Sequence, residues 1–156
     1  MIYTNLKFGK HKGMTLPQII INDPDWFFWA MHKGIFRGPL ADEAKSLNVK
    51  ARYIKIPGRS EDNPLVADYM VDPDSGVLED MQIVHEDEYM DNHGVQTYRR
   101  KVIDIGYVTE ISKKDKVGRE LLKNRLKHYL FGSSKIRLTA KMCEKFFDDN
   151  SNFIRS

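Results

Sequence analysis

The hydrophobic pattern of the chain changes at Pro57-Gly58, and this change limits the folds that the chain can adopt. Before it, Pro, Gly and Asp residues separate short segments that have helical caps. After it, residues 65–71 and 77–84 have the composition of strands, and they flank residues 72–76, whose sequence Asp-Pro-Asp-Ser-Gly is typical of a turn. The two parts therefore predict different secondary structure within one chain of 156 residues.

From this pattern we predict the α+β fold class. The first domain, residues 1–56, is expected to be a small β-α-α module. The second, residues 57–156, is expected to be an antiparallel sheet followed by two C-terminal helices. A β-rich region over residues 95–111, bent at Gly106, supplies the third strand of the predicted sheet.

Local signals give the bounds of the other elements. A strand is predicted over residues 4–8, and Thr15 with Gln18 forms a capping-box pattern that opens a short helix. Caps and glycines then delimit four further helices, which are predicted over residues 24–33, 40–52, 115–131 and 139–148.

The formal net charge of +3 conceals a strong sorting of charge along the sequence. Residues 1–59 carry ten basic and four acidic side chains, and residues 99–156 carry fifteen basic and seven acidic ones. Between them, residues 60–98 carry eleven acidic side chains and no Lys or Arg. The two basic ends and the acidic middle therefore need separate explanations.

Several classes of protein are excluded. The apolar stretches are far shorter than the roughly 20 residues of a membrane span, and the N-terminus lacks the features of a secretion signal. A single cysteine, Cys143, excludes an internal disulfide framework and a multi-cysteine zinc site. We therefore expect a cytoplasmic protein without a membrane segment, and no motif indicates a cofactor or a metal.

The most specific motif is LKFGKHKGMTL at residues 6–16, followed by DPDWFFW at residues 23–29. Over about residues 4–45 the sequence resembles the small C-terminal module of exodeoxyribonuclease X-like proteins. It is also similar to the stand-alone quorum-sensing-regulated virulence factor family of bacteria and phages. The resemblance implies an accessory role in nucleic-acid processing in a phage or bacterium. It does not imply nuclease activity, because the module lacks the catalytic carboxylates and this chain lacks the Asp-x-Glu signature of the exonuclease.

The motif contains a basic loop with the candidate binding residues Lys10, His11 and Lys12 between two glycines. Such a loop before a helix N-terminus presents amides and cations to a phosphate. It is not a nucleotide P-loop, because Met14 stands where that motif has lysine. A plain turn remains the alternative. The aromatic run at residues 26–29 is either a base-stacking platform or, as we favour, the core of the module.

The second basic candidate is a stripe on the helix over residues 115–131. Four cations recur there at spacings of three and four, namely Lys116, Arg119, Lys123 and Lys127. Apolar residues are predicted to face the core on the other side, namely Val117, Leu121, Leu122, Leu126 and Tyr129. The stripe indicates sequence-independent contact with a DNA or RNA backbone, and an ordinary solvated helix face is the alternative.

The acidic segment 61–91 has three interpretations. The favoured one is internal neutralisation, in which the basic residues 99–101 pair with the acidic hairpin across the sheet. The second is an interaction or inhibitor protein whose acidic, DNA-mimicking hairpin binds a basic host protein. The third is a metal-dependent nuclease, with candidate ligands Asp68, Asp72, Asp74, Glu79 and Asp80 but no recognised spacing. A further acidic and His-rich stretch over residues 85–93 is best explained as a polar loop.

Taken together, the sequence predicts a non-enzymatic nucleic-acid-binding accessory protein.

Overall fold

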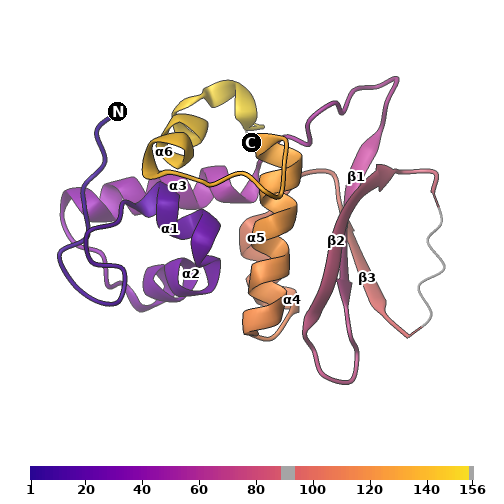
Figure 1. The fold of residues 1–156 in the computed structure, drawn as a ribbon, viewed down its shortest axis with the longest axis horizontal. Helices are drawn as coiled ribbons and strands as arrows, with labels where there is room; N and C mark the ends of the chain where they lie inside the picture. Colours follow the sequence, from indigo (N-terminus) through magenta and orange to yellow (C-terminus); the bar gives the residue numbers. More distant parts are fainter. Residues whose placement is uncertain (89–93, 155–156) are drawn as a thin grey trace.

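The computed structural model describes residues 1–88 and 94–154, and it has the α+β fold that the sequence predicts (Figure 1). Helices lie at both ends of the chain, and three antiparallel strands lie between them. The elements are α1 (Leu16–Asn22), α2 (Pro24–Lys33), α3 (Pro39–Arg52), β1 (Leu65–Val71), β2 (Leu78–His85), β3 (Gln96–Arg100), α4 (Ile105–Ile111), α5 (Lys116–Phe131), α6 (Ala140–Asp148) and the 3-10 helix η1 (Asn150–Asn152). Within the described residues, no helix has the length and hydrophobicity that crossing a membrane requires.

Cap residues explain why the predicted helix bounds are accurate. The side chain of Asp23 caps α2, and Gly34, at φ 65°, ends it in the left-handed region that favours glycine. In the same way Asp115 caps α5 by accepting a 2.9 Å hydrogen bond from the amide of Gly118. Thr139 caps α6. These signals lie in the sequence next to the helix ends, so they could be read without knowledge of tertiary contacts.

The predicted strand over residues 4–8 is wrong. Only Leu6 forms a ladder-like pair: its amide donates to the carbonyl of Met14 at 2.8 Å, and its carbonyl accepts from the amide of Gly13 at 2.8 Å. This closes a loop rather than a sheet. The capping box is also wrong, because the hydroxyl of Thr15 is buried without a hydrogen-bond partner among the described residues, although Thr15 does precede the first turn of α1.

The predicted third strand over residues 95–111 is wrong in its second half, where residues 105–111 form α4. The helix forms because Asp104 caps it, accepting a 2.8 Å hydrogen bond from Tyr107, and because Ile105 and Val108 turn toward the core together. Gly106 does not bend a strand. It lies in α4, where a Cβ atom would stand 2.5 Å from the guanidinium carbon of Arg52.

The sheet has the strand order β2-β1-β3, with both pairs antiparallel. Helices cover one of its faces, as Figure 1 shows for α5 and α4. On that face the amide of Ile83 donates a 3.1 Å hydrogen bond to the hydroxyl of Tyr129, and the ring of Tyr107 packs edge-on against Tyr69 and Tyr98. The bond to Tyr129 holds α5 against β2 and so helps to place its basic residues, whereas Tyr107 holds α4 against β1 and β3.

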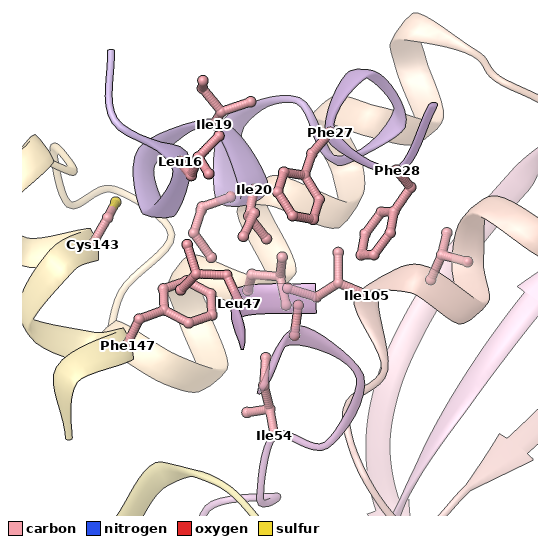
Figure 2. Packing of buried hydrophobic residues seen from close by; sticks show 14 of the residues in the cluster. Leu16, Ile19, Ile20, Phe27, Phe28, Leu47, Ile54, Ile105, Cys143 and Phe147 are labelled. Carbon is pink, nitrogen blue, oxygen red and sulfur yellow. The ribbon is translucent and has the colours of Figure 1, made fainter. Parts of the chain in front are cut away.

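One buried cluster joins the N-terminal helices to the rest of the chain. Figure 2 shows Leu16, Ile20 and Phe27 meeting Leu47 of α3 and Phe147 of α6. The cluster continues to the sheet, and it therefore contains residues from both sides of the predicted boundary at residue 56. The division into domains 1–56 and 57–156 stays a prediction.

Candidate nucleic-acid interface

The basic loop is a tight turn held by its two glycines. Gly9 and Gly13 have φ values of 75° and 90°, which other residues rarely adopt. The amide of Lys12 donates to the carbonyl of Gly9 at 3.2 Å, and Gly13 is bonded to Leu6. Lys10 and His11 of this turn contact residues at the start of α2, whereas Lys12 is exposed to solvent.

The carboxylate of Asp23 binds two side chains of this loop. Its Oδ2 atom lies 2.9 Å from Nζ of Lys10 and accepts a 2.9 Å hydrogen bond from Nε2 of His11. Its Oδ1 atom accepts a 3.4 Å hydrogen bond from the amide of Trp26 and lies 3.5 Å from Nη1 of Arg119. One carboxylate, of which only 7% is exposed, thus joins the loop, the first turn of α2 and the distant helix α5.

The electrostatics of Asp23 follow from this geometry. Burial by itself would raise its pKa, but the hydrogen bonds from Lys10 and His11 outweigh burial and hold the pKa below its usual value. The ring of His11 also packs edge-on against Trp26 at 5.1 Å. Asp23 is therefore ionised at neutral pH and neutralises part of the charge of Lys10 and Arg119.

Asp25, one residue into α2, extends the cluster. It lines a small cavity with Lys113, Asp115 and Arg119, so the first turns of α2 and α5 lie side by side. Burial raises its pKa, and so does the nearby charge of Asp23, whereas Lys114, Arg119 and Lys10 act in the opposite direction. Lys114 is exposed and belongs to the same group of cations.

The remaining candidate cations are not neutralised in this way. Lys12 and Lys116 are exposed, while Lys123 and Lys127 are half-buried along α5. None of these four has an ion pair in the described part of the chain, whereas Lys10, His11 and Arg119 do. The seven predicted residues thus divide into three that hold the loop to α2 and α5, and four that have charge available for a ligand.

The apolar side of α5 matches its prediction except at one position. Leu122 and Leu126 are buried and Leu121 and Tyr129 partly buried, but Val117 is 74% exposed, so placing it on the core face is wrong. The reason is helical geometry: at 100° per residue Val117 lies about 140° and 180° around the helix from the buried Leu122 and Leu126.

The aromatic run of α2 is core, as favoured, except at its last residue. Trp26, Phe27 and Phe28 are buried, whereas Trp29 is 49% exposed. The four side chains point in different directions because each helical residue turns by 100°.

The acidic middle is neutralised internally at two positions. Arg99 of β3 donates hydrogen bonds of 2.8 and 3.1 Å to the two carboxylate oxygens of Asp68 on the adjacent strand. Arg125 of α5 likewise donates hydrogen bonds of 2.8 and 3.2 Å to the two carboxylate oxygens of Asp80. The pairing across the sheet that the sequence predicts is therefore present for Asp68. Arg99 also donates to the carbonyls of Glu86 and Glu88.

The metal-ligand candidates do not converge. Asp68 and Asp80 are occupied by arginines, and Asp72 holds its own turn by accepting from Asp74 and Ser75. In residues 1–88 and 94–154, no three ligand-type side chains come together in a way that would hold a metal ion. Two members of the acidic and His-rich stretch, Asp91 and His93, lie outside the described residues.

Sequence reasoning missed two features of this site. It did not give Asp23 a role in joining distant segments, and it gave no role to Arg125. An Asp-Pro pair signals the cap, but no local signal marks a partner 96 residues away.

Searches for relatives add no further constraint: no family model, curated protein or solved structure matches the chain.

Proposed function

We propose that the chain is a non-enzymatic accessory protein that binds the phosphate backbone of a nucleic acid without strong sequence specificity. The observation that carries this proposal is the contact between Arg119 and Asp23. It joins the basic loop and the basic stripe of α5, which are about a hundred residues apart in the sequence, into one surface. Two separate basic segments therefore act on the same ligand.

The cations of this surface have different roles. Lys10, His11 and Arg119 share the carboxylate of Asp23, so they position the loop against α2 and α5. Lys12, Lys116, Lys123 and Lys127 contact phosphates. Each such contact releases counterions, which gives affinity that depends on salt and hardly on sequence.

The test is a salt titration of binding, followed by the fluorescence anisotropy of labelled single- and double-stranded DNA and RNA. Four phosphate contacts predict that affinity falls by roughly 50- to 150-fold between 50 and 200 mM salt. The double variant Lys116→Ala/Lys123→Ala should flatten the logarithmic slope by about 1.5. The matched control is Lys45→Ala/Lys55→Ala, which removes two exposed lysines outside this surface and should leave the slope unchanged. Absence of binding to all four ligands at 50 mM salt would overturn the proposal.

A second candidate function rests on the acidic end of the sheet. The amide of Glu86 donates a 2.9 Å hydrogen bond to the carbonyl of Pro64, which brings two exposed acidic segments together. They contribute Glu61, Asp62, Glu86, Asp87 and Glu88. A protein that binds a basic host partner would use this acidic surface. In that case the chain would not bind nucleic acid at low salt, so the same titration separates the two functions.

A further inference from the structure

Trp29 differs from the other aromatic residues of α2 because it faces solvent. Trp26 is 9% exposed and Phe27 is fully buried, whereas Trp29 is 49% exposed. The core contacts of α2 are complete without it, since Ala30 and Phe28 on either side of Trp29 are buried. Keeping so large an apolar ring in water has no benefit for the fold.

The exposed face that carries Trp29 continues into the basic surface. Asp25 lies one turn earlier on this face and lines a cavity together with Lys113 and Arg119 at the start of α5. Lys33 lies one turn later and is exposed. Along this face the indole ring therefore lies between Lys33 and Asp25, and Asp25 borders the cations Lys113 and Arg119 at the N-terminal end of α5.

We propose that Trp29 is a stacking platform for an unpaired base, and that the ligand of the basic surface is single-stranded nucleic acid. This inference rests on the proposed function and specifies its ligand. A cationic surface that follows a backbone, together with an exposed aromatic ring, is the combination that single-strand-binding proteins use. In a duplex the bases are already stacked on one another, and they offer no open face to an indole ring at the surface of the protein.

The chain offers a direct probe, because it contains two tryptophans and Trp26 is buried. Oligothymidylate, oligouridylate and a DNA duplex of equal length are titrated at one salt concentration, while tryptophan emission and anisotropy are recorded. Both single strands should quench the emission of the exposed ring. Trp29→Ala should abolish this quenching and weaken single-strand binding by about 5- to 150-fold, the range that corresponds to one stacked base. Binding of the duplex should not change.

Two further variants make the test specific. Trp29→Phe keeps an aromatic face and should retain part of the affinity. Val49→Ala, which alters an equally exposed apolar residue on α3, should have no effect. The salt slope should be the same in all three variants, because no charge is altered.

The outcomes separate this inference from the function on which it rests. If single strands bind but Trp29→Ala leaves their affinity unchanged, stacking is refuted and backbone binding stands. Equal weakening of single strands and duplex would refute the single-strand preference. If the wild-type protein binds no nucleic acid, the proposed function itself fails. A change in the sedimentation behaviour of Trp29→Ala without any effect on binding would assign the ring to a protein contact instead.

Discussion

Two of the three aspartates that are buried in the described part of the chain, Asp23 and Asp68, are neutralised in different ways. Asp68 lies on the central strand, and a single arginine from the neighbouring strand holds both of its oxygens. Asp23 lies at a helix end and is shared by Lys10, His11 and Arg119, which come from two distant segments. The first arrangement links two strands of the sheet, and it neutralises the charges of both Asp68 and Arg99. The second joins separate elements and leaves cations around it that reach solvent.

This difference explains the sorted charges of the sequence. Part of the acidic middle is used within the fold, because Asp68 and Asp80 each bind an arginine. The basic ends hold more cations than acidic residues, and among the described residues Lys12, Lys116, Lys123 and Lys127 have no ion pair. The most informative variants are therefore those that remove one partner from each aspartate.

Arg99→Ala should have the largest effect. It leaves the carboxylate of Asp68, whose side chain is 1% exposed, buried without its partner, and we expect a loss of about 3 kcal/mol of unfolding free energy. Urea denaturation measures it. Arg125→Ala is the matched control: Asp80 is 20% exposed and can be hydrated, so a loss of about 1 kcal/mol is expected. Equal losses would show that the two pairs do not differ in burial as described.

Asp23→Ala should be less destabilising, by about 2 kcal/mol, because the cations that it leaves behind can turn toward water. About half of this loss comes from the missing helix cap. Asp23→Asn keeps a capping oxygen and removes only the charge, so it should recover that half in the same denaturation experiment. If both variants are equally destabilised, the cations rather than the cap account for the whole effect.

The pH dependence of stability should distinguish Asp23 from its uncharged variant. The pKa of Asp23 is lowered in the folded protein, so its contribution is complete above the unfolded pKa of about 4 and is lost as the pH falls through the folded value. The difference in unfolding free energy between wild type and Asp23→Asn should therefore be constant from pH 7 to 5 and shrink below pH 4. A difference that persists to pH 2 would contradict the ion-pair description.

Lys10→Ala should have the smallest effect, roughly 0.5 kcal/mol or less, because its side chain is half exposed and His11 still donates to the same oxygen. The measurement is again urea denaturation, with Lys12→Ala as the unpaired control. A loss above about 1 kcal/mol would show that Asp23 depends on Lys10 alone rather than on a shared set of cations.

Features that depend on residues close together in the sequence were predicted, and features that depend on contacts between distant residues were not. Helices α2, α5 and α6 were predictable because their caps lie next to them, and β1 with its turn was predictable for the same reason. Helix α4 was not, because its β-branched residues favour a strand and only Asp104 opposes them. For the candidate site, the basic residues could be named in advance. The contact that unites them, between Asp23 and Arg119, depends on tertiary packing and has no local signal.

The pairing of Ile54 has a consequence for the order of events during protein synthesis. Ile54 forms β-bridges with both Ile103 and Phe153, and Lys55 and Tyr53 bond to residues 152 and 154. The segment after α3 is thus paired with one about a hundred residues further along, next to α6, which packs against α1. At 5–20 residues per second, a ribosome needs roughly 5 to 20 seconds to deliver that segment. During this interval the nascent N-terminal helices expose the surface that later packs against α6, and this is when a chaperone would bind them.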